Sequence, residues 1–206
     1  MKMKKEVKVL GLSYSQSSAG SYVVVLSEKK GKRKLPIVIK PSDAQQIALK
    51  IEGVKSPRPL THDLFKSLTD SYMIDIQEVY IYAILEGVFY TKLVTSNGVE
   101  EVEIDCTAGD GIALSIVYGC PLFVAKEVLD VSGVYINDDG STVSQSDMSE
   151  VEDAEYEEEE EVIPVKRVVS IEDLEHMIED AIRNEEYEIA AEIRDRIEKL
   201  KKEGEK

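Results

Sequence analysis

The sequence predicts an α+β fold in which hairpins of a mixed or antiparallel sheet alternate with three packed helices, followed by a disordered acidic linker and a C-terminal α-helical hairpin. Three observations lead to this prediction. Short runs with alternating apolar and polar residues are separated by turn signals, which is typical of strands. Other runs repeat apolar residues every three or four positions, which is typical of helices. Acidic residues are concentrated in one stretch around position 150, where apolar residues are few.

The first 40 residues predict a strand followed by a hairpin. Apolar residues over 7–10 mark the strand, and two longer apolar runs, 22–26 and 35–39, flank a charged turn that contains Gly31. Two such runs around a glycine-containing turn are typical of a β-hairpin. These strands give the sheet its first part.

Two helices are expected next. Ser42 and Gln45 have the spacing of a capping box, and apolar residues recur at helical spacing up to position 51. After a proline-containing connector, Thr61 has the position of an N-cap for a second helix. We therefore expect one helix over 42–51 and another that begins at Thr61.

The second half of the first domain repeats this order of strands and a helix. A turn signal, Asn97-Gly98, separates the last two of three strand-like runs. Thr107 and Asp110 have capping-box spacing for a third helix, and Gly119 suits its C-terminal end. Residues 122–131 form an apolar tail to the domain. The three runs are 74–83, 88–94 and 99–104.

Charge divides the chain into three parts. The 206 residues carry a formal net charge of -16, yet residues 1–135 hold equal numbers of acidic and basic side chains. Residues 136–165 contain acidic side chains and no lysine or arginine, so like charges repel and too little apolar surface is available to offset the entropy of ordering. We predict a domain over 1–135, a disordered acidic linker over 136–169 and a helical hairpin over 170–206. A neutral domain does not exclude an anionic ligand, but it would bind nucleic acid weakly and in a salt-sensitive way.

The C-terminal segment predicts two short helices with an apolar, coiled-coil-like seam. Ser170 and Asp173 form a capping box at its start. Two helices of this length have too little core to be stable alone. The seam therefore predicts a partner, which is another copy of the chain, another protein or the first domain. The residues expected to contact it are Leu174, Ala190, Ile193, Arg194, Ile197 and Leu200.

Several classes of protein are excluded by simple counts. No apolar run approaches the ~18 residues of a membrane span, and the N-terminus does not have the pattern of a signal peptide. Cys106 and Cys120 have neither metal-ligand spacing nor a disulfide framework. The sequence contains no P-loop, nucleotide-binding fingerprint or serine elbow. We expect a cytoplasmic protein without contact to a membrane.

The string Arg58-Pro59-Leu60-Thr61-His62-Asp63-Leu64 resembles the bifunctional nuclease domain family. The resemblance extends over about residues 5–135 and implies an α+β domain that cuts both DNA and RNA. The family usually reads Asp-x-Arg-Pro-Ser-Asp-Ala where this chain has Asp105 to Gly111, so Thr107 replaces an arginine, and Lys40 replaces a family glycine. Supporting runs are Leu35-Pro36-Ile37-Val38-Ile39, Asp43-Ala44 with Ile47-Ala48-Leu49, Gly87-Val88-Phe89-Tyr90, Asp105 and Asp110 with Ile112-Ala113-Leu114, and Pro121-Leu122-Phe123-Val124.

Residues 170–203 are similar to the UVR motif, the helical hairpin of bacterial excision-repair proteins and of some protease adaptors. The resemblance implies protein–protein contact, often of hairpin against hairpin. It agrees with the partner that the apolar seam predicts, and we expect a homo-oligomer. The matching positions are Leu174, Met177, Ala181, Tyr187, Glu188, Ala190, Ala191, Arg194, Asp195, Ile197 and Leu200.

Two hypotheses for function follow. The first is a nuclease of low sequence specificity, because phosphodiester hydrolysis needs an activated water and stabilisation of the charge that builds on phosphate oxygens, commonly with Mg²⁺ or Mn²⁺ held by carboxylates. The second is a non-catalytic adaptor whose hairpin docks a partner and whose first domain is an oligomerising or ligand-binding platform. The candidate catalytic residues are His62, Asp63, Asp105 and Asp110, with Arg58 and Lys40 for substrate phosphate. Helix capping alone also accounts for several of these residues, so both hypotheses stay open.

Overall fold

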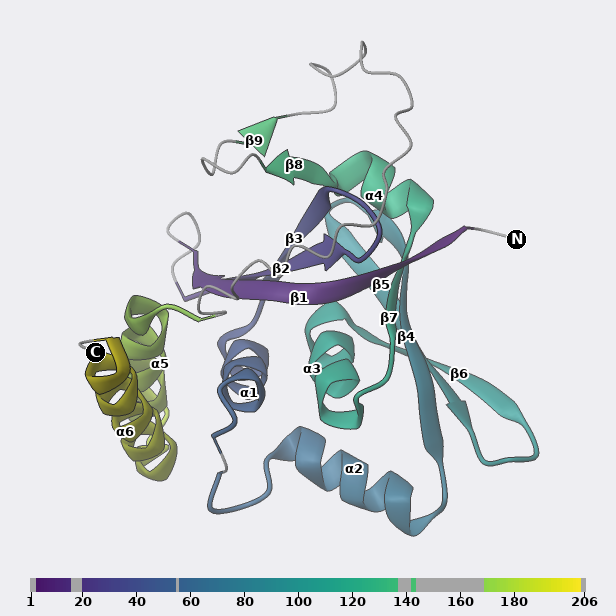
Figure 1. The fold of residues 1–206 in the computed structure, drawn as a ribbon. Coiled ribbons are helices and arrows are strands. Elements are labelled where there is room, and N and C mark those ends of the chain that lie inside the picture. The colour runs from purple at the N-terminus through teal and green to yellow at the C-terminus, as the bar shows by residue number, and fades with distance from the viewer. Residues whose placement is uncertain (1–2, 16–19, 55, 137–141, 144–168, 205–206) are drawn as a thin grey trace.

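The computed structural model describes residues 3–15, 20–54, 56–136, 142–143 and 169–204. One sheet runs through the molecule, in the order β6-β5-β4-β7-β1-β2-β3-β8-β9. In the view of Figure 1, α1, α2 and α3 lie below β1 and α4 lies above it. The strands are β1 (Lys4–Tyr14), β2 (Tyr22–Glu28), β3 (Arg33–Ile39), β4 (Asp75–Leu85), β5 (Val88–Ser96), β6 (Glu101–Thr107), β7 (Leu122–Ala125), β8 (Val134–Ile136) and β9 (Thr142–Val143). The helices are α1 (Pro41–Ile51), α2 (Thr61–Ser71), α3 (Ala108–Tyr118), α4 (Lys126–Ser132), α5 (Ile171–Arg183) and α6 (Tyr187–Gly204).

The sheet is built from two antiparallel three-stranded units. Strands β1, β2 and β3 form the first unit, and β4, β5 and β6 form the second. Strand β7 lies between them, antiparallel to β1 and parallel to β4. Each unit is followed directly by a helix, α1 after β3 and α3 after β6. The mixed sheet with its helices confirms the predicted α+β class.

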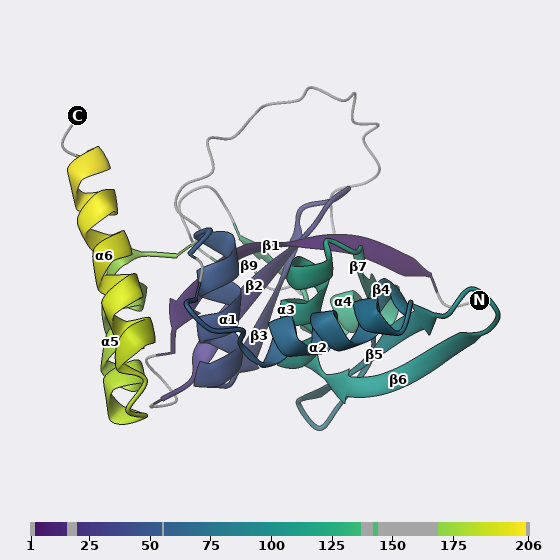
Figure 2. The ribbon, with the colours of Figure 1, turned by 90° about the horizontal axis from the view of Figure 1, so that it is seen from below.

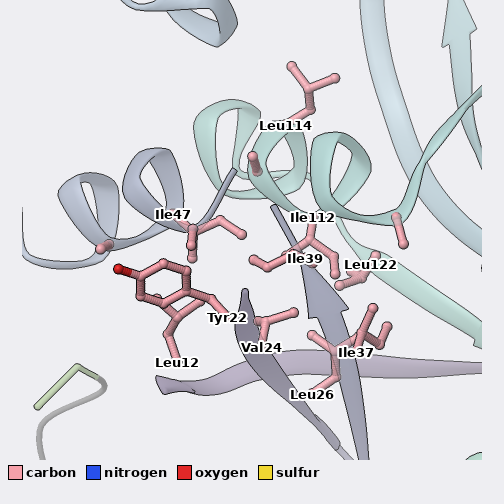
Figure 3. Packing of buried hydrophobic residues seen from close by; sticks show 14 of the residues in the cluster. Leu12, Tyr22, Val24, Leu26, Ile37, Ile39, Ile47, Ile112, Leu114 and Leu122 are labelled. Atoms are coloured by element: carbon pink, nitrogen blue, oxygen red, sulfur yellow. The ribbon is translucent and has the colours of Figure 1, made fainter. Parts of the chain in front are cut away.

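The core lies between the first unit and the helices α1 and α3 (Figure 3). Side chains on β2 and β3 alternate between buried and partly exposed, which places Tyr22, Val24 and Ile37 on the buried face. Ile47 of α1 and Ile112 of α3 are fully buried against them. The alternation of polar and apolar residues thus fixes which face of each strand meets the helices.

One predicted helix start and one predicted N-cap are shifted. Helix α1 begins at Pro41 with Lys40 as its N-cap, and the Ser42 hydroxyl donates to the Asp43 carboxylate, so the predicted Ser42–Gln45 capping box is wrong. Proline has its φ preset for the first helical position, which explains the earlier start. Helix α2 begins at Thr61 as predicted, but its N-cap position is Leu60, one residue before the predicted N-cap.

One of the other two predicted capping boxes is confirmed, at α5, and the one at α3 forms only its N-cap half. The Asp110 backbone N–H donates to Thr107 Oγ1 over 3.2 Å at the start of α3. The Asp173 backbone N–H donates to Ser170 Oγ over 3.0 Å at the start of α5, and the Ser170 N–H donates to the Asp173 carboxylate. Gly119 has the left-handed conformation (φ 68°) that ends α3.

The region predicted as an apolar tail holds β7 in the middle of the sheet and a fourth helix, α4. The prediction of three helices in the first domain was therefore one short. The start of the predicted linker also differs, because β9 pairs with β8. Most of that linker lies outside the described residues. No helix within the described ranges has both the length and the apolarity to cross a membrane.

The helices α5 and α6 pack side by side and lie next to α1 (Figure 2). Their apolar seam belongs to the same core cluster as the first domain. The Tyr14 N–H donates to Asp173 over 2.7 Å, the Tyr22 hydroxyl donates to Asp180 over 3.0 Å, and Arg196 donates to Glu52 over 2.9 Å. Among the three partners that the seam predicts, the first domain of the same chain is the one that covers it here.

Candidate functional site

The first turns of α1, α2 and α3 meet at one place. Asp43 is in the first turn of α1, and its carboxylate lies against Gly109 in the first turn of α3. A Cβ atom built on Gly109 would be 2.1 Å from Asp43 Oδ2, so only glycine fits there without movement. His62, in the first turn of α2, places its Nε2 atom 3.4 Å from Asp110 Oδ1. One imidazole and two carboxylates therefore meet where three helices begin.

Burial and neighbouring charges shift the pKa of the Asp43 carboxyl group. Only 3% of its surface is exposed, and this burial raises the pKa of its carboxyl group above the ordinary value. The neighbouring carboxylate of Asp110 raises that pKa further, whereas Lys40, Ser42 and His62 oppose the rise. Lys40 Nζ lies 3.7 Å from Asp43 Oδ1. A shifted carboxyl group beside a specific charged partner is a feature of functional sites as well as of structural ion pairs.

His62 has an unfilled hydrogen-bonding position. The residue is 7% exposed, and its Nδ1 atom is buried with no hydrogen-bond partner among the described residues. Buried polar atoms are nearly always paired, so an orphaned one points to a bound ligand, a water or a reaction. Since Nε2 faces Asp110, the carboxylate orients the ring and leaves Nδ1 as the position available for chemistry.

A pocket of about 410 Å³ opens beside this cluster. Lys40, Asp43, Thr107 and Gly109 contribute its polar side, and an apolar wall comes from β3 and from the turn between β4 and β5. The N-terminal ends of α1 and α3 border it. Backbone N–H groups at helix N-termini attract anions, so a phosphate group suits this place if the two carboxylates are compensated.

Other residues predicted for the site have contacts elsewhere. The Asp63 carboxylate pairs with Lys50 and accepts the Leu60 backbone N–H over 3.2 Å. Asp105 is exposed on β6 and accepts the Tyr82 hydroxyl over 3.3 Å. Arg58 is exposed on the connector before α2, and no ion pair or hydrogen bond involves it within the described ranges. Of the four predicted catalytic residues, the structure thus brings His62 and Asp110 together.

Asp43 is the site residue that the sequence analysis did not select. Its position repeats that of Asp110, because each is the third residue of a helix that directly follows a three-stranded unit. Comparison of Lys40-Pro41-Ser42-Asp43 with Thr107-Ala108-Gly109-Asp110 would have revealed this repeat. The misplaced capping box at Ser42 hid the correspondence, because it shifted the expected helix start.

The predicted partner-binding residues have two different surroundings. Leu174, Ile193 and the other apolar members are buried, at 7% exposure or less, within the hairpin and against the first domain. Arg194 is exposed, with 66% of its side chain accessible, and pairs only with the adjacent Asp195 in the described structure. A partner that approaches the docked hairpin would therefore meet its charged outer side.

The donor atoms at the cluster suit a hard cation in part. In the described portion of the chain, no group of three or more His, Cys, Asp or Glu side chains is arranged to hold a metal ion. Mg²⁺ is usually bound by one or two carboxylates together with waters and substrate phosphates, whereas a structural Zn²⁺ site needs four protein ligands. Asp43 and Asp110 supply two carboxylates, the number of protein ligands that the first arrangement uses.

Comparison with known proteins adds two family matches. The model of a family described as "Bifunctional nuclease domain" matches residues 24–137, and that of the "UvrB/uvrC motif" matches residues 169–203. Two proteins, from two strains of Mycobacterium tuberculosis, are each 33% identical over 153 residues, which is 74% of this chain and 91% of theirs. Both bear names that describe them as uncharacterized. The first family match includes the whole cluster around His62.

Proposed function

This chain belongs to the bifunctional nuclease domain family, and on that premise we propose that it is a nuclease of low sequence specificity that hydrolyses phosphodiester bonds in DNA or RNA. The observation that carries the proposal is the meeting of His62, Asp43 and Asp110 at three helix N-termini. Sequence-independent cleavage needs a phosphate site and a proton acceptor rather than contacts to bases. The cluster offers a proton acceptor in His62, and the adjoining pocket, which Lys40 and Asp43 line, offers a place for phosphate.

His62 is the proposed general base. Histidine titrates near neutral pH, and a carboxylate on one ring nitrogen holds the ring so that the other nitrogen can accept a proton from water. Asp110 supplies that carboxylate, at 3.4 Å. Nδ1 is buried and His62 does not line the pocket, so the substrate or an attacking water reaches it only when side chains between His62 and the pocket move aside. Lys40 and the N-terminal ends of α1 and α3 would attract the phosphate group.

A divalent cation is part of the proposal, because two carboxylates and a phosphate repel one another. Asp43 and Asp110 would hold Mg²⁺ or Mn²⁺, which would neutralise phosphate oxygens and stabilise the charge that develops on them. Arg58 is proposed as a further phosphate contact, since it is exposed on a connector between two prolines. A domain with balanced charge makes few phosphate contacts, so binding should be weak, and it should weaken further as salt is added.

Cleavage assays with purified full-length protein test the proposal. Wild-type protein should cut single-stranded DNA or RNA in Mg²⁺ or Mn²⁺ and stop in EDTA, whereas His62→Ala, Asp43→Asn and Asp110→Asn should each lose about 100-fold or more in rate. Asp70→Asn is the matched control, because it removes an exposed carboxylate from the helix that carries His62. Mg²⁺ titration by calorimetry should lose its heat in the two aspartate variants. Equal cleavage by all preparations would show a contaminating nuclease and refute the proposal.

The alternative is a non-catalytic adaptor that uses its hairpin to bind a protein partner. The UVR-type match and the exposed charged side of the hairpin favour it. Comparison of the full chain with a chain that ends at residue 165 separates the two functions. A partner retained only by the full chain, together with the absence of metal-dependent cleavage, would support the adaptor. Metal-dependent cleavage by both chains would support the nuclease.

A further inference from the structure

An apolar surface extends over α2 and the edge strand β6, on residues that do not line the pocket beside Asp43. A groove of about 460 Å³ lies between them. Its walls include Phe65 and Leu68 of α2 and Val102 and Ile104 of β6, and Glu100 is the charged residue in its lining. Strand β6 is the last strand at its end of the sheet, so nothing in the described chain continues the sheet beyond it.

A ridge of exposed side chains runs beside this groove. Leu64, Leu68 and Tyr72 follow one another at intervals of four residues, which places them on one stripe of α2. They are 65%, 54% and 69% exposed. Met73, at the end of α2, and Val99, in the turn before β6, are 84% and 93% exposed. Single exposed apolar residues are ordinary, but several that line one groove, or adjoin its lining in the chain, mark an interaction site.

The exposed area is the size that a stable dimer needs. With Val102 and Ile104 at 44% each, the seven residues together equal about four and a half fully exposed large side chains. Six of the seven are not aromatic, so at about 150 Å² each, the lower end of the range for aromatic residues, they offer about 700 Å². That is about the area that one partner buries in an interface of standard size. It exceeds the apolar patch of a typical monomer, about 300–600 Å².

The surface is complementary to itself. In a two-fold dimer each partner presents the same patch, so a patch that docks on its own copy must contain both the protruding and the receiving part. Here the ridge of α2 and the groove beside it share Leu68 and Tyr72. A two-fold axis through the patch would set the ridge of one copy into the groove of the other.

The charges of β6 argue against two other occupants. Glu101, Glu103 and Asp105 alternate with the apolar residues of the strand and therefore lie on its other face. Antiparallel pairing of two β6 edges would bring these carboxylates opposite one another, which is unfavourable. The same acidic row disfavours nucleic acid at this edge.

We propose that a second copy of this chain packs on the α2–β6 surface, with ridge set into groove about a two-fold axis, to form a homodimer. The helix covered in this way is the one whose first turn holds His62. Dimerisation buries its outer stripe and thereby fixes α2 between the partner and α3. The proposal does not depend on catalysis, since it concerns the opposite side of α2.

Analytical ultracentrifugation of the full chain over about 1–100 µM tests the proposal. Wild-type protein should be a dimer, and Leu68→Asp should weaken it at least about 100-fold, because each dimer loses two buried leucines and gains two buried charges. Val99→Asp should weaken it as well, and at 93% exposure it cannot disturb the fold of one copy. Val131→Asp is the control, since Val131 is 76% exposed on α4, outside the patch.

Two results would overturn the proposal. One is a monomeric wild-type protein over the whole range, which would leave the groove to a different protein. The other is a dimer that Leu68→Asp and Val99→Asp leave unchanged, which would place the interface elsewhere, for example on the hairpin. Thermal unfolding of each variant at low concentration shows whether the monomer is intact, and Val99→Asp decides the matter if Leu68→Asp does not fold.

Discussion

Replacement of Gly109 by alanine is the most direct probe of how α1 and α3 meet. The added Cβ would lie 2.1 Å from Asp43 Oδ2 and 2.9 Å from Asp43 Cγ. Carbon and oxygen atoms ordinarily stay about 3.3 Å apart, so the carboxylate must withdraw by about 1 Å. Asp43 is buried, and its carboxylate has little room to withdraw.

Overpacking of this kind costs about 1–3 kcal/mol, and the better helix propensity of alanine returns a fraction of a kilocalorie at a helix terminus. We expect Gly109→Ala to lower the free energy of unfolding by about 1–2 kcal/mol. For a chain of this size the melting temperature should fall by about 3–6 °C. A displacement of 1 Å at a site can also reduce the rate about 100-fold, so the proposed nuclease activity should fall with stability.

A double-mutant cycle isolates the cause. In an Asp43→Ala background, the remaining contact of the added Cβ is with Asp43 Cβ at 3.1 Å, and most of the clash disappears. Gly109→Ala should therefore be nearly neutral or stabilising there, which gives a coupling of about 1–2 kcal/mol between the two positions in urea unfolding. Equal destabilisation in both backgrounds would refute the contact between Gly109 and Asp43.

Three further predictions rest on other contacts. Burial raises the pKa of Asp43, so the folded protein holds that proton more tightly than the unfolded chain, and stability falls as pH rises from the ordinary value of 3.8 through the raised one. The stability of wild type minus that of Asp43→Asn, from urea unfolding at a series of pH values, should decrease over that window, and a flat difference would contradict the raised pKa. Burial raises the pKa of Cys106 to about 12, so its alkylation near pH 8 should be about 1,000-fold slower than that of an ordinary thiol until urea exposes it. Rapid labelling of the native protein would speak against a buried thiol. Tyr22→Phe removes the hydrogen bond to Asp180 and should lower the free energy of unfolding by about 1–2 kcal/mol. Proteolysis of the hairpin should be faster than in the control Tyr187→Phe, whose tyrosine is 64% exposed. Equal proteolysis would mean that this bond does not hold the hairpin.

Local signals in the sequence predicted most of the fold. The Ser170–Asp173 capping box and the N-cap bond of Thr107 are confirmed, because both are made by residues three apart and need no distant partner. Strand β7 was missed, since a run of four apolar residues becomes a strand only through pairing with β1 and β4, far away in the sequence. The same long-range dependence applies to the order of strands in the sheet.

Only part of the site was predictable from the sequence, because its other contacts join residues that are far apart in the chain. His62 and Asp110 stand out by residue type and by family resemblance, and the structure places them 3.4 Å apart. The contacts of Asp63 with Lys50, and of Asp105 with Tyr82, come from tertiary neighbours that no local pattern reveals. The buried position of Asp43 depends on the absence of a side chain at residue 109, on another helix.

The central place of the N-terminal strand affects how the protein is made. Strand β1 can pair with β2 as soon as both leave the ribosome, but its other edge pairs with β7, at residues 122–125. At about 5–20 residues per second, that edge waits roughly 5–20 s for its neighbour. During synthesis the two three-stranded units therefore exist as separate half-sheets, and their joining by β7 is the step at which a nascent chain becomes this fold.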